Sequence, residues 1–126
     1  MKMLLVIALG GAMGALGRYA TVTQVSRWLG VEFPYGTLAV NILGSVILGF
    51  LVETLALKAP LNEELRGFLV IGLLGAFTTF STFSLDVVLL LQRHAYLTAG
   101  GYIIANVAVC VGGLFLAMIL ARQIWT

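Results

Sequence analysis

Residues 75–84 read Gly75-Ala76-Phe77-Thr78-Thr79-Phe80-Ser81-Thr82-Phe83-Ser84, and this run is the most informative stretch of the chain. It interrupts a hydrophobic segment with hydroxyl and aromatic side chains, because apolar residues precede it from Gly67 and follow it to Leu91. Serine and threonine compete for backbone hydrogen bonds, and both glycine and β-branched threonine lower helix propensity. The run therefore predicts a helix that is broken or unwound near residues 75–79. Lipid tolerates such a break only where protein or a polar path surrounds it.

The composition of the chain is that of a membrane protein. Of its 126 residues, 61% are hydrophobic and 10% are charged, and the mean hydropathy is +1.10. One crossing of the hydrocarbon core takes about 20 apolar residues. Four windows meet this length, at residues 4–28, 36–57, 65–91 and 97–124. We therefore expect an all-α membrane protein in which residues 1–126 form one four-helix transmembrane domain and the third helix is broken in mid-membrane.

Positively charged residues flank these windows at both ends. One end of the bundle would carry Lys2, Lys58, Arg66 and Arg122. The other end would carry Arg27 and Arg93, and also Arg18 if that side chain extends to the interface. Because orientation follows the side with more Lys and Arg, a bias of this size leaves two interpretations open. Either every chain inserts in one direction, or both directions occur and an antiparallel homodimer forms.

The small size of the chain also favours an oligomer. Four helices have little interior in which to enclose a water-accessible path. Small residues such as Gly10, Gly14 and Gly44 would allow helices to approach closely. Whether those contacts lie within one subunit or between subunits stays open.

Residues that could perform catalysis are scarce. The chain has one histidine, His94, and one cysteine, Cys110, so a paired-cysteine metal or redox site is excluded. The sequence offers no nucleophile with a base and no cluster of His, Cys and carboxylate residues at metal-binding spacing. We expect neither an enzyme nor a nucleic-acid-binding protein.

Three motifs, in order along the chain, resemble those of the Fluc (CrcB) family of fluoride channels. They are Gly14-Ala15-x-Gly17-Arg18-Tyr19, Gly36-Thr37-Leu38-x-Val40-Asn41-x-x-Gly44-Ser45 and Gly75-x-x-Thr78-Thr79-Phe80-Ser81-Thr82-Phe83-Ser84. The resemblance covers essentially the whole chain. It implies a passive channel of the bacterial-type inner membrane that exports cytoplasmic fluoride and confers fluoride resistance. It also implies an antiparallel dual-topology homodimer with two fluoride pathways and a structural Na+ at the centre of the interface.

The resemblance assigns this Na+ to the backbone carbonyls of Gly75 and Thr78. Carbonyls that end a half-helix lack intrahelical partners and carry partial negative charge, which agrees with the assignment. From the residues alone, a break that binds water or packs on a partner helix stays an alternative. Phe80 and Phe83 share a helix face. The resemblance makes them fluoride contacts through their electropositive ring edges, with plain packing as the alternative.

Polar residues elsewhere would complete the pathway. Asn41 can donate hydrogen bonds through its amide, and bonding between helices is its alternative role. Tyr102, Asn106 and Cys110 recur every four residues and form a polar stripe on the fourth helix. They would line the same pathway as Ser81, Thr82 and Ser84, although a cysteine thiol is a poorer donor than a hydroxyl. Arg18 would lie at a vestibule or extend to the membrane interface.

Two other classes of membrane protein remain alternatives. A small dual-topology multidrug or cation transporter has a similar length, but it needs a buried acid in the first helix, and residues 4–18 contain none. A non-transporting membrane assembly protein would carry no ions and would not require a hydroxyl-rich break. The residues themselves do not separate a passive channel from a proton-coupled exchanger.

Overall fold

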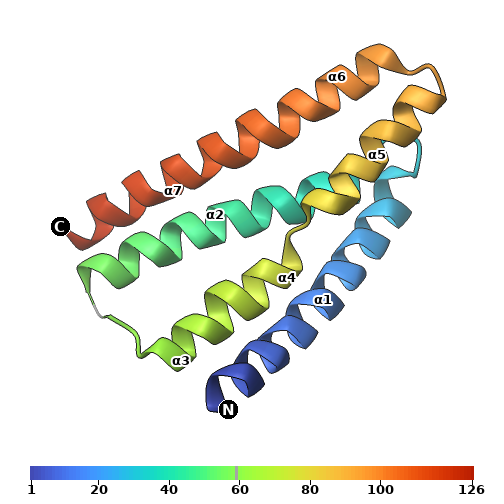
Figure 1. Ribbon diagram of the computed structural model, residues 1–126. Coiled ribbons are helices and arrows are strands. Elements are labelled where there is room, and N and C mark those ends of the chain that lie inside the picture. Colours follow the sequence, from blue (N-terminus) through green and yellow to red (C-terminus); the bar gives the residue numbers. More distant parts are fainter. Residues whose placement is uncertain (59) are drawn as a thin grey trace.

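The computed structural model describes residues 1–58 and 60–126, and these residues form a bundle of helices with no strand among them (Figure 1). Among the described residues, four helical segments are long and apolar enough to cross a membrane, namely Lys2–Leu29, Tyr35–Leu57, Glu63–Gln92 and Tyr96–Trp125. The prediction of an all-α protein with four helices of this kind is confirmed. The connection expected between Lys58 and Asn62 includes residue 59, which lies outside the described residues.

The first two crossings are single helices, α1 (Lys2–Leu29) and α2 (Tyr35–Leu57). Gly30 directly follows α1, and its φ of 87° is a positive value that glycine adopts without steric penalty. The chain can therefore reverse within a short connection and enter α2.

The third and fourth crossings combine α-helix and π-helix. The third consists of α3 (Glu63–Arg66), the π-helix η1 (Gly67–Leu74), α4 (Gly75–Phe77) and α5 (Phe80–Gln92). The fourth consists of α6 (Tyr96–Ile104), the π-helix η2 (Ala105–Val109) and α7 (Cys110–Trp125). π-Helical turns are rare and occur frequently at functional sites. Because both π-helices lie in the inner part of their crossings, this part of the bundle is a candidate functional site.

The crossings pack as neighbours in an up-and-down arrangement (Figure 1). α2 packs against α7 and α1, α1 also packs against η1 and α4, and α5 packs against α6. Because the chain reverses at each connection, both termini lie at the same end of the bundle. α2 therefore holds the first and fourth crossings together.

Two glycines bring helices unusually close to the third crossing. A Cβ atom added at Gly14 of α1 would overlap the carbonyl oxygen of Leu73. One added at Gly44 of α2 would overlap Cγ2 of Thr78. These close contacts lie within one chain, which is one of the two possibilities that the sequence left open.

Most large hydrophobic side chains face outward. Leu97 is 94% exposed and Phe80 is 76% exposed, whereas soluble monomers rarely expose broad apolar surfaces. The largest fully buried side chains are Tyr102, Leu90 and Val40. The chain therefore presents an apolar exterior that suits lipid or another subunit.

Candidate functional site

Helical geometry is interrupted between α4 and α5. Thr78 and Thr79 have extended backbones, with φ −84° and ψ 161° at Thr78 and φ −154° and ψ 123° at Thr79. Oγ1 of Thr79 accepts a hydrogen bond from the Thr82 amide at 3.1 Å and so caps the start of α5. We refer to Thr78 and Thr79 as the break.

The break redirects two backbone amides. In an unbroken helix the Thr79 amide would donate to the carbonyl of Gly75, four residues earlier. Here it donates to Oδ1 of Asn41 at 2.8 Å. The Thr82 amide, which an unbroken helix would direct to the Thr78 carbonyl, donates to Thr79 Oγ1 instead. The carbonyls of Gly75 and Thr78 are thus released from their usual helical donors, at the negative end of the α4 dipole.

Arg18 reaches the break from α1. Its side chain is partly buried, and its Nη1 donates to the Thr78 carbonyl at 3.3 Å. The guanidinium therefore points into the bundle rather than along α1 to the helix end. It places a positive charge beside the Thr78 carbonyl.

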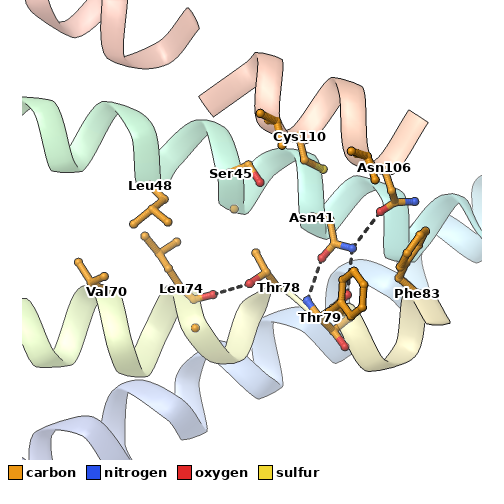
Figure 2. A pocket seen from close by; sticks show the side chains of 15 residues that line it. Asn41, Ser45, Leu48, Val70, Leu74, Thr78, Thr79, Phe83, Asn106 and Cys110 are labelled. Atoms are coloured by element: carbon orange, nitrogen blue, oxygen red, sulfur yellow. Dashed lines mark hydrogen bonds between the residues drawn. The ribbon is translucent and has the colours of Figure 1, made fainter. Parts of the chain in front are cut away.

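Asn41 of α2 holds both backbone groups of Thr79 (Figure 2). Its Oδ1 accepts from the Thr79 amide, and its Nδ2 donates to the Thr79 carbonyl at 3.0 Å. Nδ2 also donates to Oδ1 of Asn106, on η2, at 3.0 Å. Nδ2 of Asn106 in turn donates to the carbonyl of Tyr102 at 3.3 Å. One polar network therefore joins the second, third and fourth crossings at the break.

A groove with a volume of about 350 Å³ opens beside this network. Its polar lining consists of Asn41, Ser45, Thr78, Thr79, Asn106 and Cys110. Its apolar lining includes Val70, Leu74, Phe80 and Phe83. None of the described residues that line it carries a charge. Such a groove offers hydrogen-bond donors without a fixed charge that would trap an anion.

Phe80 and Phe83 both line the groove but differ in burial. Phe80 is largely exposed, whereas Phe83 exposes only 7% of its surface. Their ring centroids lie 5.3 Å apart, with the planes tilted by 51°. Aromatic ring edges carry partial positive charge. Phe80 therefore offers an accessible ring, while packing fixes the ring of Phe83.

Tyr102 lies outside the groove lining although it belongs to the polar stripe of the fourth crossing. Its side chain is fully buried, and its hydroxyl donates to Oδ2 of Asp86 at 2.8 Å. Its ring packs against Phe83, with the centroids 5.3 Å apart. Of the predicted stripe, the groove is reached by Asn106 and Cys110.

The three α5 hydroxyls that the sequence analysis placed along the pathway make local contacts. Ser81 and Thr82 lie near Oγ1 of Thr79, with oxygen–oxygen distances of 3.3 and 3.1 Å. Ser84 Oγ donates to the carbonyl of Phe80 at 2.9 Å. All three side chains are exposed and lie outside the groove lining of the single chain.

Several groove residues have no role in the sequence analysis. Ser45 and Leu48 follow Asn41 by four and seven residues, and this helical spacing is the signal that could have found them. Val70 and Leu74 line the groove from η1. No sequence pattern separates those two from lipid-facing residues.

The four apolar helices and the polar groove at the break define a multi-pass membrane protein with a site inside its bundle. The chain belongs to the CrcB family, because the family profile described as "CrcB-like protein, Camphor Resistance (CrcB)" matches residues 5–118. The family identified from the three motifs is therefore confirmed. With its four apolar helices, the chain is a multi-pass protein of the bacterial inner membrane.

Several similar proteins carry the name fluoride-specific ion channel FluC. One from Chelativorans sp. (strain BNC1) is 50% identical over 121 residues, which cover 96% of this chain and 97% of that protein. One from Rhodospirillum centenum is 46% identical over 122 residues, or 97% of each chain. One from Phenylobacterium zucineum is 44% identical over 126 residues, or 99% of each chain. The similarity therefore extends over nearly the full length of each protein.

Proposed function

We propose that this protein is a passive, fluoride-selective ion channel that exports cytoplasmic fluoride down its electrochemical gradient. The observation that carries this proposal is the uncharged groove at the break, where amide and hydroxyl groups lie beside the accessible ring of Phe80. The names of the similar proteins support the same function. Such a channel would protect a cell after hydrogen fluoride crosses the bilayer and dissociates.

The chemistry of the groove suits a small anion that is strongly hydrated. A selective path must replace hydration water with hydrogen-bond donors and stay too narrow for larger anions. The groove lining carries side chains of this chemical kind, namely the amides of Asn41 and Asn106 and the hydroxyls of Ser45, Thr78 and Thr79, which would exchange their present hydrogen bonds for bonds to the ion. The ring edges of Phe80 and Phe83 would add weak electropositive contacts without the trapping strength of a lysine or arginine. Weak contacts allow the ion to leave.

We further propose an antiparallel dual-topology homodimer in which the break lies at mid-membrane. The exposed ring of Phe80 supports it, because a second chain could cover this ring and complete the path. The exposed hydroxyls of Ser81, Thr82 and Ser84 would then face the partner chain. This arrangement would give these hydroxyls the pathway role that the single chain leaves open.

The carbonyls of Gly75 and Thr78 would hold a structural Na+ in that dimer. Unwound carbonyls and the C-terminal ends of half-helices are typical Na+ ligands in membrane proteins, and the break releases both oxygens from their usual donors. Arg18 shares the Thr78 oxygen, but a carbonyl has a second lone pair. When bound, the ion would offset the negative ends of the two α4 helices.

Removing sodium tests this ion site. Replacing Na+ by N-methylglucamine should lower the thermal unfolding temperature of the purified dimer, because the facing carbonyls would lose their counter-charge. Equal unfolding temperatures in the two buffers would contradict the site.

Flux from liposomes tests the function itself. The purified protein is reconstituted, a potassium gradient with valinomycin sets the potential, and a fluoride electrode records efflux, with chloride-loaded liposomes as the control. We expect rapid fluoride loss that depends on the potential, without chloride loss. Folded protein that passes no fluoride would refute the proposal. Fluoride flux that follows a pH gradient instead of the potential would indicate a proton-coupled exchanger.

The other membrane-protein classes have weaker support. The N-terminal half of α1, residues 4–18, carries no acid of the kind that a small multidrug transporter requires. A non-transporting assembly protein does not account for a donor-lined groove at a helix break.

A further inference from the structure

A second groove lies between α2 and α7, the helix pair with the most extensive contact in the bundle. Its volume is about 660 Å³, and all but one of its lining residues are apolar or glycine. We call it the outer groove, and its lining includes Ile47, Phe50 and Thr54 from α2 and Gly113, Leu116 and Ile124 from α7. Leu116 and Ile124 are 60% and 61% exposed. The outer groove is therefore open and has an apolar surface.

The outer groove and the groove at the break lie on opposite sides of α2. α2 contributes Asn41 to the groove at the break and Phe50 to the outer groove. The nine residues from one to the other make about two and a half turns of this α-helix, so their side chains point in opposite directions. In the proposed dimer the partner chain covers Phe80 beside the break. The outer groove would therefore stay in contact with lipid.

The length of the outer groove matches one leaflet of a bilayer. Its lining runs from Gly113 to Ile124 along α7, and a helical segment of this length rises about 16 Å. Half of a hydrocarbon core about 30 Å thick is about 15 Å. A membrane-spanning helix of a second chain would need a surface about twice as long. These dimensions favour an acyl chain over a transmembrane helix as the occupant.

Polar and charged side chains gather where the outer groove meets the ends of α2 and α7. Nε1 of Trp125 donates to Oγ1 of the groove residue Thr54 at 3.0 Å. Nζ of Lys58 lies over the Trp125 ring, 5.6 Å from its centroid. Nε of Arg122 donates to Oε1 of Glu53 at 2.8 Å. Tryptophan and basic side chains are typical of the membrane interface. These contacts place an interfacial cluster at the end of the groove.

This cluster carries a positive charge beyond its one ion pair. Glu53 is only 6% exposed and is paired with Arg122, whose side chain is 64% exposed. No carboxylate of the described residues lies within ion-pair distance of Lys58. The next acids along the chain, Glu63 and Glu64, belong to α3, which packs against α1 and η1. Arg122 therefore neutralises the buried acid, and Lys58 leaves one net positive charge at the end of the groove.

We propose that the outer groove and this cluster bind one anionic phospholipid. Its acyl chain would lie between α2 and α7, and its phosphate would lie beside Lys58 and the exposed guanidinium of Arg122. Basic pockets between transmembrane helices bind anionic head groups in this way. The ring of Trp125 would lie at the level of the head group. The site is separate from the groove at the break, so the proposal goes beyond fluoride conduction and does not depend on it.

Trp125 is a natural fluorescent reporter at this site. The chain has two tryptophans, Trp28 and Trp125, so the variant Trp28→Phe emits from Trp125 alone. This variant is reconstituted in phosphatidylcholine vesicles, in which part of the lipid is either phosphatidylglycerol or phosphatidylcholine with brominated acyl chains. Bromine quenches tryptophan at short range, so the two titrations compare how strongly the two lipids bind beside Trp125. Trp125→Phe leaves only Trp28, at the opposite end of the bundle, as the control for insertion.

We expect phosphatidylglycerol to bind beside Trp125 about fivefold more strongly than phosphatidylcholine, which corresponds to about 1 kcal/mol from one basic residue at the membrane surface. Lys58→Gln should remove this preference. Arg66→Gln is the matched control, because it removes one cation from the same end of the bundle but from α3, and it should keep the preference.

Three outcomes of these titrations would overturn the proposal. One is equal binding of the two lipids beside Trp125. Another is a preference that survives Lys58→Gln, or that Arg66→Gln lowers to the same extent. The third is a Trp125 that neither brominated lipid quenches while Trp28 is quenched, because another protein chain would then cover the groove.

The acyl-chain part of the site has its own test. Leu120 lines the outer groove and is 56% exposed, so Leu120→Trp fills the groove from the lipid side. Leu97→Trp makes the same change at an exposed position outside the groove lining. Native mass spectrometry of the detergent-purified proteins counts the phosphatidylglycerol molecules that each chain retains. We expect the unmodified protein and Leu97→Trp to retain this lipid and Leu120→Trp to lose most of it. Equal retention in the two variants would overturn the assignment of the groove.

Discussion

Phe80 and Phe83 lie three residues apart in the chain but have different surroundings in the fold. Phe80 is mostly exposed in the single subunit, and Phe83 is packed between the ring of Phe80 and that of Tyr102. Loss of the Phe80 ring would therefore remove the proposed ion contact with little loss of packing inside the subunit. Loss of the Phe83 ring would remove both the proposed ion contact and packing.

We predict that Phe80→Ile reduces fluoride efflux by about twofold to tenfold, because an aromatic contact contributes roughly 0.5–1.5 kcal/mol. The thermal unfolding temperature of the subunit should stay nearly unchanged. Phe83→Ile should reduce efflux and also lower the unfolding temperature, through a packing loss of about 1–3 kcal/mol. Liposome flux and thermal unfolding measure the two effects separately.

Phe115 provides a matched control for these variants. It lies on α7, it is 63% exposed, and it is not part of the groove lining. Phe115→Ile should leave fluoride efflux unchanged. Equal efflux in Phe80→Ile and Phe115→Ile would remove Phe80 from the pathway.

Single-residue patterns in the sequence identify polar groups but do not give their partners. The spacing of Asn106 and Tyr102 placed both on one helical stripe, yet the fold buries the Tyr102 hydroxyl against Asp86 and leaves Asn106 at the groove. The sequence likewise left two positions open for Arg18, and the bond to Thr78 is a long-range contact that no local pattern encodes. Partners that lie on other helices become visible only once the helices are packed.

At the scale of helices, the contact between α2 and the break depends on Gly44. An added Cβ atom there would overlap Cγ2 of Thr78, so the helix or the break must shift. The overlap also lies one turn after Asn41, which holds Thr79 from the same helix. A shift at Gly44 should therefore disturb the network that orients the groove.

We predict that Gly44→Ala destabilises the protein by about 1–3 kcal/mol, as overpacking of a close contact does, and that it reduces fluoride efflux. Gly112→Ala on α7 is the matched control, because a Cβ atom at that position meets nothing within 4 Å. Alanine favours helix over glycine, so the control should be as stable as the unmodified protein or slightly more stable. A stable, fully active Gly44→Ala would show that the break does not depend on this contact.

Hydrophobicity and length predict the four crossings, because a membrane-spanning helix needs a long apolar run and little else. The hydroxyl-rich run also indicates where helical geometry fails, since Thr78 and Thr79 are the residues with extended backbones. The π-helices η1 and η2 could not be predicted. η1 packs against α1 and η2 contacts α2, and such contacts between distant segments have no signature in a local sequence pattern.

For the molecule as a whole, positive charge lies at both ends of the bundle, with a bias of only two residues toward one end. Lys2, Lys58, Arg66 and Arg122 lie at the end that holds both termini, and Arg27 and Arg93 lie at the opposite end. The sequence predicts the membrane class but not the orientation, because insertion depends on a small difference between these two counts. The proposed dual topology is therefore open to manipulation by a few added lysines.

We predict that two variants whose charges favour opposite orientations in the membrane are each inactive alone and conduct fluoride when expressed together. Glu63→Lys with Glu64→Lys raises the cations at the end that holds the termini from four to six, against two at the opposite end. Glu32→Lys with Gln92→Lys, combined with Lys58→Gln and Arg66→Gln, reverses the bias to four cations at the opposite end against two, and all these positions are exposed. Each variant should insert in one orientation, form no antiparallel dimer and pass fluoride at the level of protein-free liposomes. Co-expression of the two should supply both orientations and restore efflux. Glu63→Gln with Glu64→Gln removes the same acids without adding cations, and since acids contribute little to orientation, it should conduct normally. If either lysine variant alone inserts in one orientation and still shows full fluoride efflux, a parallel dimer or a single chain is sufficient for fluoride conduction, and the antiparallel dimer is contradicted.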